Sequence, residues 1–164
     1  MSRYRPPAPP KSPYITAAGM RVLQQEEKAI WPRRRLVVAA LSAAAEEGDR
    51  SENAEYIYRK KELRELDRRI RYLQKRIPSL KIVDSAPSNK DLVFFGATVH
   101  LEDDSEKVSV YRIVGPDEFD HQPHYISIDS PLARGLLKRE LGEEVSVQVP
   151  GGIKIYLISA IEYQ

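Results

Sequence analysis

Two carboxylates three positions apart, Asp49 and Glu52, are the residues of this sequence best suited to chemistry. Carboxylate oxygens are hard ligands for Mg²⁺, which usually binds one or two carboxylates and keeps several waters. Two carboxylates alone would bind the ion weakly, so the pair predicts a metal site that another molecule must complete. The structural alternative is that one carboxylate caps a helix while the other lies in the positive first turn of that helix.

Ser51 and Asn53 flank Glu52 in this stretch. Their side chains could hydrogen-bond to the carboxylates or to an attacking water and so orient them. Capping is an equally good interpretation for Ser51, because short hydroxyl side chains often accept hydrogen bonds from the first N–H groups of a helix. The sequence leaves both roles open.

The segment that follows the acidic pair has the pattern of a long helix, predicted over residues 52–77. Its apolar residues recur at steps of seven, three, four, three, four and three, which is the spacing of a coiled-coil seam. Pro78 should end the regular helix, because it lacks an N–H group and restricts the residue before it. The seam consists of Tyr56, Leu63, Leu66, Ile70, Leu73, Ile77 and Leu80.

A looser seam precedes the pair and predicts a second helix, with Thr16 as its N-cap and Gly48 just past its end. Pro32 predicts a kink or local unwinding rather than two separate helices. Only residues 48–51 link the two helical patterns, so the helices should be antiparallel neighbours with the carboxylates at their tip. This seam consists of Met20, Leu23, Ile30, Val37, Leu41 and Ala44.

The rest of the chain has short, β-rich runs separated by glycine and proline. Ser130 and Pro131 suit the N-cap and first position of one short helix, predicted over residues 131–139. A small antiparallel sheet covered by this helix would bury one face, which makes the whole chain an α+β protein. The predicted strands are residues 93–101, 107–114, 125–129, 144–149 and 153–162.

These patterns predict four segments. Residues 1–14 form a disordered, proline-rich tail, residues 15–82 an antiparallel coiled-coil domain, residues 83–90 a linker, and residues 91–164 a sheet domain. No apolar run approaches the roughly 20 residues that a membrane span needs. The chain has no cysteine, which fits the reducing cytosol, and we expect a cytoplasmic monomer.

Charge is distributed unevenly along the chain. Residues 1–90 carry 20 basic and 11 acidic side chains, whereas residues 91–164 carry 6 and 13. The excess of cations on the second helix predicts a surface that faces the phosphates of a nucleic acid, the alternative being an ordinary solvated helix face. The few aromatic residues nearby argue against a base-stacking surface. The predicted basic stripe consists of Arg50, Arg59, Lys60, Lys61, Arg64 and Arg68.

Taken together, these motifs resemble the Gre family of bacterial transcript cleavage factors, and most closely its GreB branch. The resemblance covers nearly everything from Ile15 to Tyr163 and is most specific over residues 48–56, Gly-Asp-Arg-Ser-Glu-Asn-Ala-Glu-Tyr. Further matches lie at residues 59–65, 80–84, 95–97, 111–115 and 126–134.

The resemblance implies a factor that binds bacterial RNA polymerase at the rim of its secondary channel and inserts the coiled coil toward the catalytic centre. Asp49 and Glu52 match the family's tip acids, which help the polymerase hold a second Mg²⁺ and orient the attacking water. The polymerase itself would then hydrolyse backtracked nascent RNA, whose extruded 3′ end the basic stripe would hold, so the chain would be an accessory factor and not an enzyme.

The resemblance also implies roles for the second domain. Asp129, Ser130 and Pro131 match the family's loop that docks on the polymerase rim, although a strand end followed by a helix cap explains the same residues. The domain resembles the family's FKBP-like fold, which implies no prolyl isomerase activity. The two histidines of residues 120–124 could bind a metal, but a flexible loop is the simpler interpretation.

Three classes of function remain open at this point. The first is an accessory factor for RNA cleavage, which the intact acidic tip and the basic stripe favour. The second is an inhibitory relative that occupies the same channel without promoting cleavage. The third is a plain coiled-coil interaction protein, which would not require the acidic residues of the tip.

Overall fold

The computed structural model describes residues 6–164, which contribute to two compact units. Residues Met20–Leu80 form one, which we call the hairpin unit. Residues up to Gly19 and residues Lys81–Gln164 form the other, the sheet unit. None of the described helices is long and apolar enough to cross a membrane.

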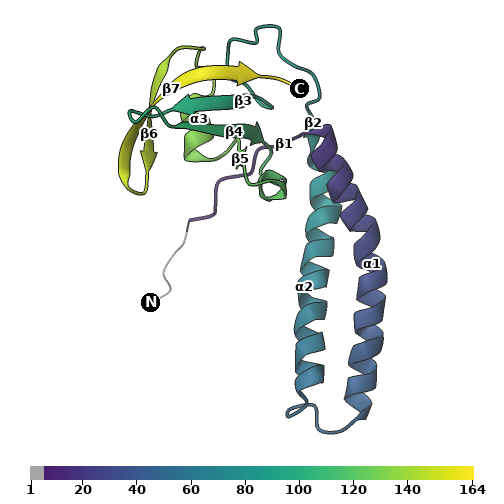
Figure 1. Ribbon diagram of the computed structural model, residues 1–164. Helices are drawn as coiled ribbons and strands as arrows, with labels where there is room; N and C mark the ends of the chain where they lie inside the picture. Colours follow the sequence, from purple (N-terminus) through teal and green to yellow (C-terminus); the bar gives the residue numbers. More distant parts are fainter. Residues whose placement is uncertain (1–5) are drawn as a thin grey trace. The chain divides into compact units, whose positions relative to one another are not determined.

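The hairpin unit consists of two helices, α1 (Ala17–Glu46) and α2 (Ala54–Arg76), of which the first turn of α1 belongs to the sheet unit. The helices run side by side in opposite directions (Figure 1), which confirms the predicted hairpin. α1 continues through Pro32 as a single helix of 30 residues. A 3₁₀ turn, η1 (Ile77–Ser79), ends α2 where Pro78 removes a backbone donor.

The seam between the helices is packed unevenly along its length. Its buried members are Met20, Leu23, Ile30, Val37 and Ala44 on α1, and Ile70 and Leu73 on α2. Toward the tip, Leu63 and Leu66 are only partly buried, and the side chains of Ile57 and Tyr58 are 54% and 59% exposed. Since hydrophobic stabilisation follows the apolar area removed from water, the N-terminal half of α2 contributes less to the seam than Ile70 and Leu73 do, although Ala44 of α1 is buried near the tip.

The sheet unit contains a five-stranded sheet in the order β5-β4-β3-β7-β6. Neighbouring strands are antiparallel except β4 and β5, which are parallel, so the predicted sheet is antiparallel in all but one pairing. The exception arises because residues 115–124, which include the 3₁₀ turn η2 (Phe119–His121), return the chain before β5 begins. The strands are β3 (Thr98–Glu102), β4 (Val108–Val114), β5 (Tyr125–Ser127), β6 (Glu144–Val149) and β7 (Gly152–Glu162).

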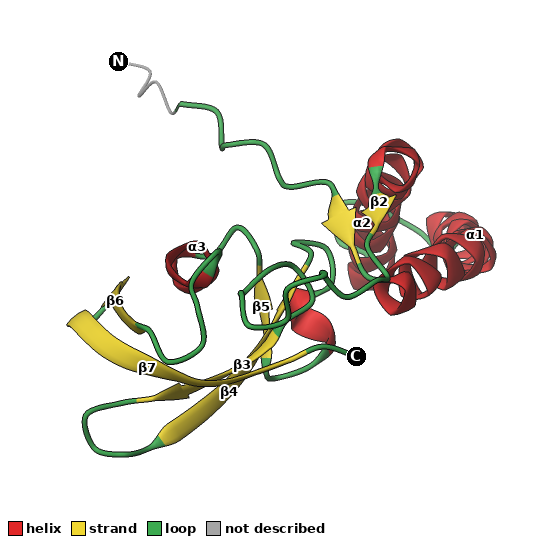
Figure 2. Cartoon of the chain, turned by 90° about the horizontal axis from the view of Figure 1, so that it is seen from above, coloured by secondary structure: helices red, strands yellow, loops and turns green. Residues whose placement is uncertain are grey.

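One short helix, α3 (Pro131–Leu136), covers a face of this sheet (Figure 2) and contributes Ala133 and Leu136 to the core. It is shorter than the predicted helix because Lys138 adopts a positive φ of 66°. β3 begins later than predicted, because Val93 N instead donates to Arg139 O, at 2.9 Å. The core is completed by Val93, Ala97, Val99, Leu101, Ile113, Val145, Val147 and Ile158.

A second, two-stranded sheet joins residues far apart in the sequence. β1 (Tyr14–Ile15) pairs in parallel with β2 (Lys81–Ile82). The predicted disordered tail is therefore wrong at its end, because Tyr14 lies in a strand, while residues 1–5 lie outside the described residues. Likewise, residues 15–19, which we assigned to the coiled-coil domain, belong to the sheet unit.

Candidate functional site

The tip of the hairpin is organised by Asn53. Its side-chain Oδ1 accepts a hydrogen bond from Tyr56 N at 3.1 Å, which makes Asn53 the N-cap of α2. Its Nδ2 donates to Ala44 O at 2.8 Å and so ties the start of α2 to the end of α1. The structural alternative for Asp49 and Glu52 is therefore wrong, because neither carboxylate caps the helix, and α2 begins at Ala54 instead of residue 52.

Asp49 is exposed but has a defined orientation. Its Oδ1 accepts hydrogen bonds from Ser51 N at 2.9 Å and from Ser51 Oγ at 2.8 Å. These bonds, the backbone one foremost, lower the pKa of Asp49 below its ordinary value of 3.8. Ser51 thus orients Asp49 and does not cap α2, and the carboxylate is fully ionised at neutral pH with Oδ2 directed to no partner among residues 6–164.

Unlike Asp49, Glu52 has no side-chain hydrogen bond within residues 6–164 that fixes its orientation. Its side chain is exposed and makes no hydrogen bond or ion pair within the described part of the chain. Residues 6–164 also contain no group of three or more His, Asp or Glu side chains that could hold a metal ion. The tip therefore offers at most two carboxylates to a cation, and the magnesium site stays a prediction.

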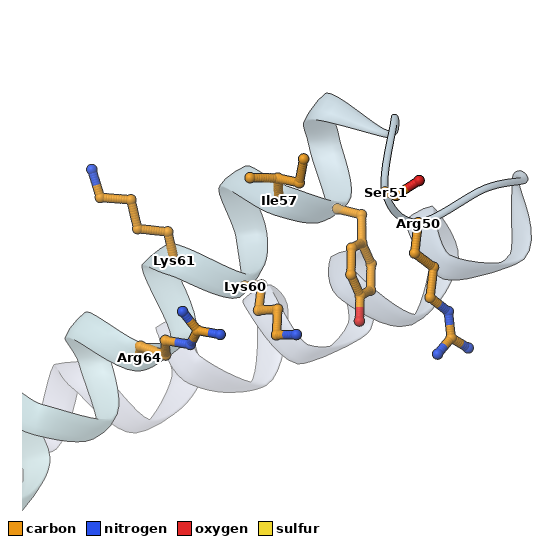
Figure 3. Close-up of a pocket in the computed structure, with 7 residues that line it drawn as sticks. Arg50, Ser51, Ile57, Lys60, Lys61 and Arg64 are labelled. Atoms are coloured by element: carbon orange, nitrogen blue, oxygen red, sulfur yellow. The ribbon is translucent and has the colours of Figure 1, made fainter.

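A basic hollow of about 660 Å³ lies on α2 directly beside the acidic tip (Figure 3). Arg50, Lys60, Lys61 and Arg64 all line it, which brings together four of the six residues of the predicted basic stripe. The rest of the lining is Ser51, Tyr56 and Ile57. The hollow thus combines four cationic side chains with the apolar surface of Tyr56 and Ile57, and Arg50 and Ser51 of its lining lie between the two acids in the sequence.

The other two residues of the predicted stripe lie outside the hollow. Arg59 forms ion pairs with Glu55 at 2.7 Å and with Glu62 at 3.0 Å, and the hydrogen bonds that it donates to them, the one to Glu55 foremost, raise its pKa. Its charge is therefore neutralised locally. Arg68 is exposed and does not line the hollow.

Tyr56 lines the hollow and contacts two of its cations, a role that the sequence pattern did not predict. Arg50 Cζ lies 5.8 Å from the centroid of its ring and Lys60 Nζ lies 5.7 Å from it. At such distances an aromatic ring attracts cations, so Tyr56 helps to place both of them. Its position in the heptad seam suggested only packing, although a tyrosine among leucines and isoleucines was a signal of another role.

Glu26, Glu62 and Asp67 form cross-helix ion pairs. Glu62 accepts hydrogen bonds from Arg33 and Arg59, and although burial acts to raise its pKa, these bonds leave it lowered. Arg34 and Asp67 pair across the helices at 2.7 Å. Each exposed pair stabilises the fold only slightly. None of the ion pairs found within residues 6–164 uses Arg50, Lys60, Lys61 or Arg64, the cations of the hollow.

The predicted docking loop lies in the sheet unit. Ser130 Oγ accepts from Ala133 N at 3.2 Å, which confirms Ser130 as the cap of α3, with Pro131 at the first helical position. Asp129 is half-buried, and both of its carboxylate oxygens accept hydrogen bonds from Ser12. The docking role of these residues stays a prediction.

The histidine-containing loop of residues 120–124 forms an ordinary turn. His121 lies 3.9 Å from Asp120, and the ring of His124 packs edge-on against Tyr125 with centroids 4.9 Å apart. Since the described residues hold no metal-ligating cluster of three or more, the loop gives no support to a metal site.

Comparison with known families accounts for nearly the whole chain. The family described as "Transcription elongation factor, N-terminal" matches residues 13–82, and that described as "Transcription elongation factor, GreA/GreB, C-term" matches residues 88–163. The chain belongs to the GreA/GreB family of transcription elongation factors. The predicted membership of the Gre family is thereby confirmed.

Individual relatives place this Gre factor near the GreB branch. It is 52% identical over 165 residues to transcription elongation factor GreB of Xanthomonas axonopodis pv. citri (strain 306), with 99% of this chain and 98% of that protein covered. It is also 52% identical to GreB of Pseudomonas aeruginosa over 164 residues, with the same coverage. The solved structure of the transcription factor Gfh1 matches 91% of this chain and 96% of its own at 24% identity, but its TM-score of 0.43 is too low to add to the assignment.

Membership of the Gre family excludes one of the three classes of function. A plain coiled-coil interaction protein would share the hairpin, but would not match a transcription elongation family over both of its units. The chain is therefore a transcription elongation factor. Whether it promotes RNA cleavage or inhibits depends on the tip.

Proposed function

We propose that this Gre factor binds bacterial RNA polymerase, inserts the tip of the hairpin through the secondary channel, and stimulates cleavage of backtracked RNA. The observation that carries the proposal is the tip itself, where an oriented carboxylate and a free one stand exposed beside a cationic hollow. α2 contains 23 residues, which corresponds to about 35 Å of helix.

The two acids would act as ligands donated to the catalytic centre of the polymerase. Mg²⁺ held jointly by polymerase residues and the tip would stabilise the attacking and leaving oxygens of phosphodiester hydrolysis. Asp49, ionised and fixed by Ser51, is prepared to bind a cation or to accept a hydrogen bond from the attacking water. Glu52 has no competing partner within the described residues and can adjust to a site formed by both molecules.

The basic hollow would hold the extruded RNA. Arg50, Lys60, Lys61 and Arg64 present four cations to a chain of phosphates, and contacts of this kind position RNA without reading its sequence. Because the hollow adjoins the two acids, RNA held there would have its scissile phosphodiester bond close to Asp49 and Glu52.

The polymerase would remain the nuclease. Two exposed carboxylates cannot assemble a two-metal site alone, so the chain by itself should leave RNA intact. Docking would depend on the sheet unit through Asp129, Ser130 and Pro131, as the family resemblance implies. We further propose that the protein acts in the cytoplasm as a monomer.

The decisive experiment uses a stalled, backtracked elongation complex whose RNA is labelled at its 3′ end. Three reactions are compared at the same Mg²⁺ concentration: the complex alone, the complex with the factor, and the factor with free RNA. Short labelled fragments should form quickly only in the second. Slowed nucleotide addition without fragments would instead assign the protein to the inhibitory class, and cleavage of free RNA would show a nuclease of its own.

A further inference from the structure

The segment before α1 reaches the loop proposed to dock on polymerase. We call residues 12–16 the N-terminal strap. Ser12 N donates to Asp129 Oδ2 at 2.9 Å, and Ser12 Oγ donates to Asp129 Oδ1 at 2.5 Å, although the two residues lie 117 positions apart in the sequence. A single serine thus binds both oxygens of the carboxylate.

The strap is held along its whole length by other parts of the sheet unit. Pro13 O accepts from Lys81 N at 2.7 Å, and the strap then continues as β1 beside β2. At its other end, Thr16 N and Oγ1 donate to the two carboxylate oxygens of Glu118 at 2.8 and 2.7 Å. Glu118 is only 1% exposed, so the strap is anchored in the interior.

Two glycines show how closely the strap is packed. A Cβ atom at Gly115 would lie 2.1 Å from Tyr14 O, and one at Gly19 would lie 2.6 Å from Glu118 Oε2. Both contacts are far shorter than van der Waals distance, so a larger residue at Gly115 would displace the strap, and one at Gly19 would displace the Glu118 carboxylate that anchors it. The sequence on both sides of the strap therefore fixes the path that brings Ser12 to Asp129.

We propose that Ser12 is a positioning residue for polymerase docking, because it holds the carboxylate of Asp129 in one orientation for a cationic group of the polymerase. The inference rests on the proposed function. A carboxylate has about four acceptor positions, and Ser12 uses one on each oxygen, so Asp129 can still accept hydrogen bonds from a lysine or arginine of the partner. A side chain fixed before binding loses less conformational entropy when the complex forms.

The test measures the affinity of the full-length chain for RNA polymerase, together with the cleavage rate at saturating factor. Ser12→Ala keeps the backbone hydrogen bond to Asp129 but loses the hydroxyl, and should weaken binding about fivefold. Ser12→Thr keeps the hydroxyl and should bind within about twofold of the wild type. The maximal cleavage rate should be unchanged in both, because the tip is intact. Ser88→Ala, in the exposed linker, is the matched control and should behave as the wild type.

A double variant shows whether Ser12 acts through Asp129. Asp129→Ala should weaken binding more than Ser12→Ala does, and Ser12→Ala combined with Asp129→Ala should be no weaker than Asp129→Ala alone. Normal binding by Ser12→Ala beside a weakened Asp129→Ala would overturn the role of Ser12 and leave docking by Asp129 standing. An equal loss from Ser12→Ala in both backgrounds would also overturn it. Normal binding by Asp129→Ala would overturn docking through this loop, and the inference with it.

Discussion

Two pairs of acids in this protein are used in opposite ways. Asp49 and Glu52 stand exposed on a tip with little packing, and only one oxygen of Asp49 is bound. Glu118 and Asp129 lie in the sheet unit, where both oxygens of each carboxylate accept hydrogen bonds from the strap. The first pair is available to another molecule, whereas the second holds the strap in place, and Asp129 is in addition the proposed docking residue.

The difference follows from how each region is stabilised. Carboxylates that must bind a shared cation cannot have all their oxygens hydrogen-bonded within the chain. The conformation of the tip is therefore stabilised by the hydrogen bonds of Asn53 and Ser51 and by the packing of the two helices. A buried carboxylate must instead be fully hydrogen-bonded, because desolvation of its charge is costly. Mutations in the tip should therefore change function without stability, and mutations around Glu118 should do the reverse.

The largest expected effect is at the tip. Glu52→Gln removes a negative charge but keeps the size of the side chain, and should reduce factor-stimulated cleavage on the order of 100-fold. Its free energy of unfolding should stay within about 0.5 kcal/mol of the wild type, because the side chain is exposed and has no partner among the described residues. Cleavage assays with saturating factor and denaturant titrations measure the two quantities. A stable variant with normal cleavage would contradict the role of Glu52.

Glu118→Ala should produce the opposite result. It leaves the backbone N–H of Thr16 and its hydroxyl without their partner in the interior, which should destabilise the protein by about 2–4 kcal/mol. Cleavage at saturating factor should be retained under conditions where the variant is folded. Glu144→Ala, an exposed acid of β6, should change stability by no more than about 0.5 kcal/mol. Equal stability of the two variants would refute the anchoring role.

Reversal of charge in the hollow should give an intermediate effect. Lys60→Glu with Lys61→Glu should reduce cleavage of long backtracked RNA about tenfold and affect release of dinucleotides less, because longer RNA makes more phosphate contacts. Arg71→Glu with Lys75→Glu makes the same change in charge on the same helix but away from the hollow, and serves as the control. Equal losses on both RNA lengths would count against a hollow that holds RNA.

The smallest effect concerns the orientation of Asp49. Ser51→Ala removes the hydroxyl but keeps the backbone donor, so the pKa of Asp49 should rise while remaining below its ordinary value. Because the pKa is lowered in the folded state, the associated stability is present above the pKa of the unfolded chain and is lost as the pH falls through that of the folded one. In Ser51→Ala the folded-state pKa of Asp49 should lie closer to the unfolded-state pKa, so the pH range over which this stability is lost should be narrower. An unchanged carboxyl titration by NMR would show that the hydroxyl contributes nothing.

Much of the architecture could be predicted because it depends on local pattern. Leu73 and Val37 are buried as their heptad spacing predicts, and Ser130 caps α3 as its place before Pro131 predicts. Residue types also located the two acids at the tip of a helical hairpin. These features require only the neighbouring residues to be known.

The contacts that the sequence did not predict are mostly those between residues far apart in the chain. Nothing near Ser12 in the sequence indicates that it meets Asp129, and β5 pairs in parallel only because of the path of the preceding loop. The sequence predicted Arg59 as part of the basic stripe, whereas in the structure its charge is paired with Glu55 and Glu62. Such outcomes depend on tertiary geometry that periodicity does not contain.

The most direct test of the account compares the wild type with Asp49→Asn over a range of Mg²⁺ concentrations, in backtracked complexes saturated with factor. The account predicts that wild type releases labelled 3′ fragments at low Mg²⁺, whereas Asp49→Asn releases none there although it binds polymerase equally well. Equal release by both proteins at every Mg²⁺ concentration would contradict the claim that the tip completes the catalytic site of the polymerase.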